Sequence, residues 1–147
     1  MVESGSSAYI ELNEIYVNFK ANIALGGIHS ADTVILNNTV YEGRAEGIFA
    51  IESGYAWIRG NTIKRNTDGI VLVDSSPHIA NNQISENMRA GVVSYACSFP
   101  KLDGNTITGH GSAGVIVRNG SAPLMTENEL TDNYYAVSSD SKKTRGS

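Results

Sequence analysis

The sequence predicts an all-β fold: a right-handed single-stranded parallel β-helix, a solenoid of about six coils with 21–25 residues each. The pattern Asn-x-(Ile/Val/Leu) returns at spacings of 25, 23, 21, 23 and 23 residues, and Gly-(Ile/Val) returns at 22, 22 and 23. The apolar residues come in short β-branched runs without helical periodicity, and leucine is scarce, so a β-helix is favoured over a leucine-rich solenoid. The repeated residues are Asn13, Asn38, Asn61, Asn82, Asn105 and Asn128, and Gly47, Gly69, Gly91 and Gly114.

Each coil is expected to hold three short strands with turns between them, for example residues 56–59, 62–64 and 69–73. Strands of successive coils should pair in parallel about 4.8 Å apart, so that equivalent residues form columns. In the repeated asparagine column each amide can bond the identical amide of the next coil, and asparagine tolerates the left-handed conformation of a turn. A second column, five residues further on, departs from asparagine at Gly43 and His110. Its other members are Asn18, Asn66, Asn87 and Asn133.

Three apolar columns are predicted to point inward and to form one continuous core. Each buried aliphatic side chain contributes about 1.5–3 kcal/mol, so these columns fix the register of the coils. They consist of Ile58, Ile79, Leu102 and Met125; of Ile63, Ile84, Ile107 and Leu130; and of Ile48, Ile70, Val92, Val115 and Val137, with Ala50, Leu72, Ser94 and Val117 two residues on.

The repeat defines one domain over residues 1–137, followed by a polar tail, residues 138–147, that is expected to be disordered. Residues 8–19 resemble a degenerate first coil, in which Tyr9, Tyr16 and Phe19 are expected to plug one end. No polar cap is evident at either end, although solenoids need caps to cover the core and the unpaired strand edges. Self-association through the coil ends, or their cover by another subunit, is therefore expected.

The charge and cysteine content narrow the range of partners. Eleven basic and fifteen acidic residues give a net charge of -4, and the only basic cluster is the short Lys-Lys-Thr-Arg at 142–145. Nucleic acid is therefore not an expected partner, since phosphate binding needs clustered Lys and Arg. A single cysteine, Cys97, can form no intrachain disulfide and favours a cytoplasmic, intracellular protein. No stretch approaches the roughly 20 apolar residues of a membrane span, so no membrane partner is expected.

Carboxylates that should stack on adjacent coils are the only candidates for catalysis. Glu46 and Asp68 each precede the repeated glycine, and Glu52 and Asp74 each follow it by five residues. Such pairs could shift a pKa or hold a cation, but the following coils place alanine or asparagine there and no aligned arginine completes a site. We therefore expect a protein that is not an enzyme, with no catalytic residue, no metal and no cofactor. The histidines occupy three different columns and do not converge: His29, His78 and His110.

The outward side of the third strand predicts a partner-binding stripe. Alternation along the strand turns apolar residues outward on successive coils, and large uncovered apolar patches commonly mark protein contacts. A neighbouring outward column contains Trp57, which could stack on a sugar ring or on a partner side chain. The predicted stripe consists of Phe49, Ile51, Val71, Val73, Val93, Tyr95, Ile116 and Arg118.

The pattern Gly-Ile-x-Val…Ile-x-x-Asn-x-Ile-x-x-Asn resembles the right-handed β-helix repeat of carbohydrate-binding proteins and sugar hydrolases. Segment 47–66, Gly-Ile-Phe-Ala-Ile-Glu-Ser-Gly-Tyr-Ala-Trp-Ile-Arg-Gly-Asn-Thr-Ile-Lys-Arg-Asn, is most similar to the β-helix repeats of F-box ubiquitin-ligase substrate receptors, and the coils up to Asn133 repeat it. In those receptors the repeats look like the protein-binding part. No F-box precedes the first coil in this sequence, so recruitment of a ligase is not implied.

Three classes of function remain open. We expect a non-catalytic protein-interaction module or a scaffold subunit, with a protein partner or larger assembly bound on the stripe or at the coil ends. One alternative is a carbohydrate-binding protein or an enzyme similar to polysaccharide lyases and hydrolases. The other is a structural protein that stacks end to end.

Overall fold

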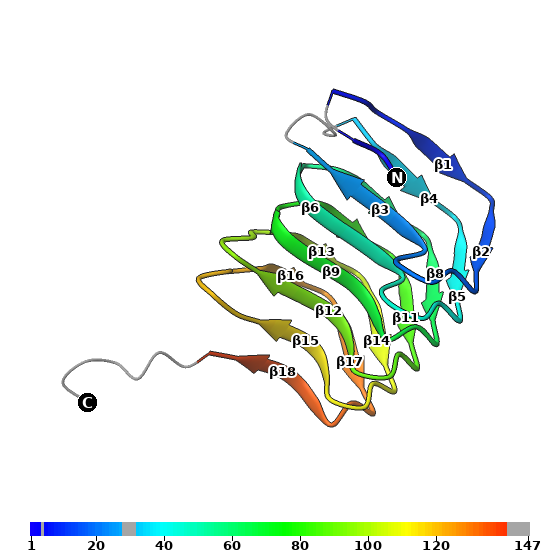
Figure 1. Cartoon of the computed structure of the whole chain (residues 1–147). Helices are drawn as coiled ribbons and strands as arrows, with labels where there is room; N and C mark the ends of the chain where they lie inside the picture. The colour runs from blue at the N-terminus through cyan, green and yellow to red at the C-terminus, as the bar shows by residue number, and fades with distance from the viewer. Residues whose placement is uncertain (4, 28–31, 141–147) are drawn as a thin grey trace.

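A computed structural model describes residues 1–3, 5–27 and 32–140, which form a parallel β-solenoid with three sheets. Each coil contributes one strand to each sheet, and the coils stack along one axis from the N-terminal to the C-terminal end (Figure 1). All pairings between strands are parallel, and the described part of the chain has no helix. The predicted all-β solenoid of about six coils is therefore confirmed.

The three sheets each contain six strands. The first sheet consists of β1 (Tyr9–Glu11), β4 (Val34–Leu36), β7 (Trp57–Arg59), β10 (His78–Ala80), β13 (Lys101–Asp103) and β16 (Leu124–Thr126). The second consists of β2 (Glu14–Tyr16), β5 (Thr39–Tyr41), β8 (Thr62–Lys64), β11 (Gln83–Ser85), β14 (Thr106–Thr108) and β17 (Glu129–Thr131). The third consists of β3 (Ile23–Gly26), β6 (Ile48–Gly54), β9 (Asp68–Ser75), β12 (Ala90–Tyr95), β15 (Ala113–Val117) and β18 (Tyr135–Ser139).

The predicted inward columns form the core in the predicted register. Ile58 pairs with Ile79, Ile63 with Ile84 and so on through the stack, and the interior members of these columns are buried. Val137 is the exception, because it is in register with Val115 but remains 45% exposed. It lies on β18, the last strand of the third sheet, so no further coil covers it.

The repeated asparagines form a buried hydrogen-bonded ladder. Within it, the Asn61 amide nitrogen donates to the Asn82 Oδ1 at 3.0 Å, and that of Asn82 donates to the Asn105 Oδ1, also at 3.0 Å. Each Oδ1 also accepts the backbone N–H of the preceding ladder residue. The ladder thus satisfies the backbone at a buried corner, where an unpaired N–H would be costly.

The left-handed residue at this corner is not the ladder asparagine, as the sequence had suggested, but the residue before it. Asn81 has a φ of 54° and Gly60 a φ of 65°, whereas the following Asn82 and Asn61 have no positive φ. The turn thus bends at the preceding residue, and the ladder asparagine points its amide inward for bonding. The same holds along the column, where the left-handed residues are Leu12, Asn37, Gly60, Asn81, Gly104 and Glu127.

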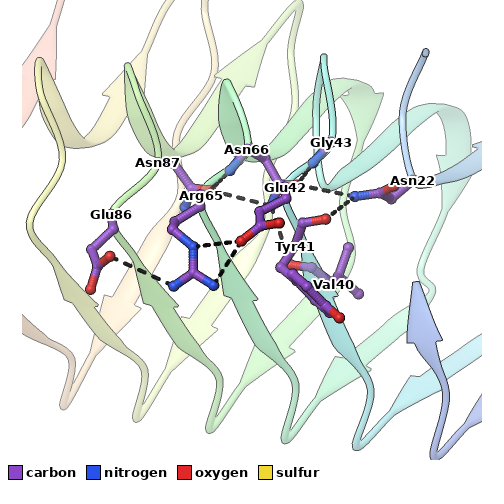
Figure 2. Close-up of polar contacts among 9 residues, drawn as sticks. All are labelled: Asn22, Val40, Tyr41, Glu42, Gly43, Arg65, Asn66, Glu86 and Asn87. Carbon is purple, nitrogen blue, oxygen red and sulfur yellow. Dashed lines mark hydrogen bonds and ion pairs between the residues drawn. The ribbon is translucent and has the colours of Figure 1, made fainter. Parts of the chain in front are cut away.

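The second asparagine column is also continuous, despite Gly43 (Figure 2). Asn22, from the turn before β3, fills the place of the missing side chain and donates to the Asn66 Oδ1 at 3.0 Å. A Cβ on Gly43 would lie only 2.7 Å from the Asn22 Nδ2, so the glycine makes room for this substitute. Asn22 also accepts from the Asn18 Nδ2 at 2.8 Å, which joins the ladder across the gap.

His110, the other departure, acts as an asparagine in this column. Its Nδ1 accepts the backbone N–H of Asn87 at 3.2 Å, as an asparagine Oδ1 does elsewhere. Its Nε2 lies 3.1 Å from the carbonyl oxygen of Ile84, the position of an asparagine Nδ2. This pair of contacts requires the neutral imidazole with its proton on Nε2. Burial, the largest cause, lowers the pKa of His110, which favours that neutral form.

The two ends of the stack differ. At the N-terminal end Val2 pairs with Leu25 on the outer edge of β3 and packs against the core. Tyr9, Tyr16 and Phe19 do not form the expected plug, because their side chains are 64%, 51% and 78% exposed.

At the C-terminal end, β18 extends to Ser139, two residues beyond the predicted domain boundary. Of the predicted tail, residues 141–147 lie outside the described part of the chain.

Candidate binding site

The predicted stripe lies on the outer face of the third sheet, but its middle is not exposed. Val93 is fully buried, and Val71 and Ile116 are 6% and 5% exposed. With Ala90 and Ala113 they form a second apolar cluster, separate from the core on the inner face, against which Phe49, Val73 and Tyr95 pack. The prediction of a continuous exposed stripe is therefore wrong.

Partly buried neighbours on the same face account for this burial, and the ends of β12 are held by further contacts. Arg89, directly before β12, donates to the carboxylate of Asp68 at 2.6 Å. The pKa of Arg89 is raised, first by this hydrogen bond to Asp68. Tyr95, at the other end of β12, packs against the apolar cluster that contains Val93.

The remaining residues of the stripe are half-buried and serve different contacts. Ile51 lies on β6 outside the apolar cluster. Arg118 donates to the carbonyl and hydroxyl oxygens of Ser138 and forms an ion pair with Asp140 at 3.2 Å. The two ends of the stripe are hollowed, by a groove of about 400 Å³ between Phe19 and Phe49 and by one of about 390 Å³ beside Arg118.

The stacked carboxylates hold structural positions. Asp68 is 4% exposed, and its carboxylate accepts from Arg89 and from the backbone N–H of Ala90 on the following coil. Glu52 and Asp74 are exposed residues with φ of 48° and 47°, so they bend the ends of β6 and β9. These contacts support the reading of the carboxylates as turn and strand-end residues.

The described histidines do not form a metal site. Within residues 1–3, 5–27 and 32–140, no group of three or more His, Cys, Asp or Glu side chains could hold a metal ion. His78 is on the outer face of the first sheet, His110 belongs to the buried ladder, and His29 lies outside the described residues. Cys97 is a free, exposed cysteine with a φ of 57° in the turn after β12.

A groove of about 290 Å³ on the outer face of the first sheet gathers three exposed aromatic residues. Trp57, on β7, is 40% exposed, while Tyr55 and Phe99, in the turns before β7 and β13, are 70% and 56% exposed. Ser76, Pro77, His78 and Lys101 complete the lining. We call this the aromatic groove.

Three successive coils build the aromatic groove. Trp57, His78 and Lys101 pair directly across β7, β10 and β13. Tyr55 stands two residues before Trp57, and Phe99 stands two before Lys101. The backbone N–H of Phe99 donates to the Ser76 hydroxyl at 3.0 Å, which fixes its turn against the one that precedes β10. Tyr55 and Phe99 thus stand on either side of the small Ser76.

The floor of the groove is packed and uncharged. The rings of Trp57 and His78 have centroids 4.5 Å apart at an angle of 47°, and the His78 Nε2 is buried without a hydrogen-bond partner. Burial, ahead of the nearby cation Lys101, lowers the pKa of His78. The imidazole is therefore neutral near pH 7, since its ordinary pKa is about 6.5.

Lys101 is the only charged side chain that lines the aromatic groove. A second cation lies at the Trp57 side of the groove, where the Arg59 guanidinium stands over the Trp57 ring at 5.5 Å from its centroid. The acidic side chain that acts on His78 is Asp103. The groove is thus apolar with a cationic side, in a chain whose net charge is -4.

The sequence drew attention to Trp57 but not to Tyr55 or Phe99. Both belong to turns and follow neither the inward nor the outward apolar columns. The spacing in the sequence could nevertheless have shown that they are neighbours. Tyr55, Ser76 and Phe99 each stand two residues before a member of the paired column Trp57, His78 and Lys101.

A comparison with known proteins identifies the fold family. The family model described as right handed beta helix region matches residues 1–140. No match was found to a curated protein or to a solved structure. No helical segment in the described part of the chain has the length and hydropathy of a membrane span. The match to the family model covers nearly the whole stack of coils, and the chain therefore belongs to the right-handed β-helix family.

Proposed function

We propose that this chain is a non-catalytic protein-interaction module or scaffold subunit that binds its partner in the aromatic groove. The observation that carries the proposal is the exposure of Tyr55, Trp57 and Phe99 around one hollow on the outer face of the first sheet. Tyrosine and tryptophan are enriched among residues that dominate the energy of protein interfaces, because they bury large areas with few rotatable bonds.

The aromatic groove replaces most of the predicted stripe as the binding surface. The buried Val71, Val93 and Ile116 have little surface left to lose on binding. The open N-terminal end of the stripe, beside Phe49, offers room for an apolar side chain but only two large rings. The likeness of the coils to the repeats of F-box receptors also supports binding of a protein. The exposed thiol of Cys97 is consistent with the cytoplasmic location that we propose.

Affinity capture with a double variant tests the proposal. The tagged chain and its Tyr55→Ala/Phe99→Ala variant would be used to capture partners from the native cell, followed by quantitative mass spectrometry. Partners specific to the unchanged chain should be lost with the variant, while its melting temperature stays the same because both rings are exposed.

The matched control is Tyr134→Ala, which removes a 75% exposed ring just before β18. This variant should retain every partner. Equal recovery of partners by the unchanged chain and the groove variant would contradict the proposal. Loss of partners from Phe49→Asp alone would instead place binding at the N-terminal end of the stripe.

A further inference from the structure

We propose that the partner segment in the aromatic groove is a proline-rich peptide in the polyproline II conformation, with a carboxylate next to its prolines. This inference rests on the proposed function and names the chemistry of the bound segment. The inference follows from the spacing of the coils that carry Tyr55 and Phe99, from the hydrogen-bond donors of Tyr55 and Trp57, and from the charge of Lys101.

The spacing of the two coils that carry the aromatic walls matches the repeat of a polyproline II helix. Tyr55, Ser76 and Phe99 occupy equivalent positions on three successive coils. With about 4.8 Å between coils, the backbones at Tyr55 and Phe99 lie about 9.6 Å apart along the stack. A polyproline II helix repeats every three residues with a rise of about 3.1 Å each, or about 9.3 Å per turn. A segment that runs along the stack would therefore present residues i and i+3 to the two rings in the same way.

The small residue between the rings leaves space for a proline ring. Ser76 is the side chain between Tyr55 and Phe99, and the buried Pro77 and half-buried His78 form the floor beside it. Grooves lined by aromatic residues are a recurring site for polyproline II segments, which lose little conformational entropy on binding because they are already extended.

Two hydrogen-bond donors at the groove are unused. Among the described residues, neither the Tyr55 hydroxyl nor the Trp57 indole N–H has a hydrogen-bond partner in the chain. A polyproline II segment has no internal hydrogen bonds, so its carbonyl oxygens are available as acceptors. Proline itself brings no backbone N–H that the groove would have to satisfy.

The charge of the groove selects an acidic segment. Lys101 stands beside Phe99 at one side and Arg59 packs on Trp57 at the other, while His78 between them is neutral. The Asp103 carboxylate, which also acts on His78, accepts a hydrogen bond from the Thr126 hydroxyl at 3.0 Å, so Lys101 is the charged group that the groove itself presents. A glutamate at every third residue would lie on one edge of the polyproline II helix and could face this side of the groove.

Fluorescence of the single tryptophan provides a direct assay. The chain would be titrated with a capped (Pro-Pro-Glu)3 peptide, with a flexible (Gly-Ser-Glu)3 peptide of equal charge, and with (Pro-Pro-Lys)3. We expect a saturable change in Trp57 emission with the first peptide. Binding of the other two should be weaker by about tenfold or more, given the cost of ordering a flexible chain and of like charges.

Variants and a sugar ligand make the outcome decisive. Tyr55→Ala/Phe99→Ala should weaken (Pro-Pro-Glu)3 binding by about tenfold or more, Lys101→Glu should reverse the preference for Glu over Lys peptides, and Tyr134→Ala should change neither. Equal affinity for the flexible peptide would overturn the inference. So would a saturable signal with cellohexaose but not with the proline peptide, which would identify a sugar site. If partner capture still depends on Tyr55 and Phe99 while no proline peptide binds, the proposed function stands and this inference falls.

Discussion

Replacing Asn82 by alanine tests how much the buried ladder stabilises the stack. Asn82 is 1% exposed and makes four side-chain hydrogen bonds. Its Oδ1 accepts from the backbone N–H and the side-chain amide of Asn61 at 2.9 and 3.0 Å. Its Nδ2 donates to the carbonyl oxygen of Ile58 at 2.9 Å and to the Asn105 Oδ1 at 3.0 Å. The alanine variant loses all four bonds at once.

The magnitude follows from what is left unpaired. The Asn61 amide keeps its bond to the carbonyl oxygen of Ile35, and the Asn105 Oδ1 keeps the backbone N–H of residue 82. The backbone N–H of Asn61 loses its acceptor at a buried corner, which costs about 1–3 kcal/mol, and each further bond lost costs about 1 kcal/mol. We expect the free energy of unfolding to fall by about 4–6 kcal/mol, which lowers the melting temperature by roughly 8–24 °C.

Urea and thermal unfolding followed by circular dichroism would measure this loss. Gln83→Ala is the matched control, because it removes an exposed amide one residue away and should change the free energy of unfolding by less than about 0.5 kcal/mol. If the two variants lose the same stability, the ladder is not the source of the stabilisation and the reasoning fails.

An aspartate at position 82 adds a pH test of the same geometry. Asn82→Asp keeps an acceptor for Asn61 but places a second oxygen against the carbonyl of Ile58 and the Oδ1 of Asn105. Burial and these acceptors should raise the pKa of the new carboxyl above its ordinary value of about 3.9. The folded state then binds the proton more tightly than the unfolded state, so this variant should gain stability relative to the unchanged chain as the pH falls. A difference that does not depend on pH would refute this account.

Three further perturbations follow from buried polar and glycine positions. Because burial lowers the pKa of His110, its contribution to stability should be complete above about pH 6.5 and decrease as the pH falls below that value; His110→Asn should make this slope shallower in unfolding measured from pH 5 to 8, while the share of His78, whose pKa is also lowered, remains. Ser94→Ala should raise the free energy of unfolding by up to about 1 kcal/mol, and with it the melting temperature, since the Ser94 hydroxyl is buried without a hydrogen-bond partner. A lower melting temperature would show that the hydroxyl has a partner. Gly91→Ala should cost about 1–3 kcal/mol or more in urea unfolding, because its Cβ would lie 2.6 Å from the Ile107 Cγ2 and 2.7 Å from the Gly114 carbonyl oxygen; unchanged stability would mean that the coil can shift.

The repeat made the fold and the core predictable. Each coil places the same type of residue at the same position, so that the spacing of Ile58 and Ile79, or of Asn61 and Asn82, fixes the pairing of whole strands. A shift of one residue in this register would turn every core residue toward solvent. In a parallel stack, residues one repeat apart in the sequence therefore lie next to each other on adjacent coils.

Contacts between different columns were not predictable in this way. Asn22 fills the gap beside Gly43 from a turn outside the repeated asparagine positions. Alternation correctly turned Val93 outward but could not show that it is covered by packing against neighbours such as Tyr95. The aromatic groove depends on two turn residues, Tyr55 and Phe99, whose proximity comes from the stacking of alternate coils.

The pairing of Val2 with Leu25 gives the two described ends of the stack different outlines. Val2 adds a paired residue to the third sheet outside β3, whereas β16, β17 and β18 are the last described strands of their sheets. If the edge of β18 paired with Val2 of a second copy, the facing strands of the other two sheets would lie about 9.6 Å apart, twice the spacing that hydrogen bonds require. Contact between these two ends would therefore leave the strand edges of the first and second sheets unpaired.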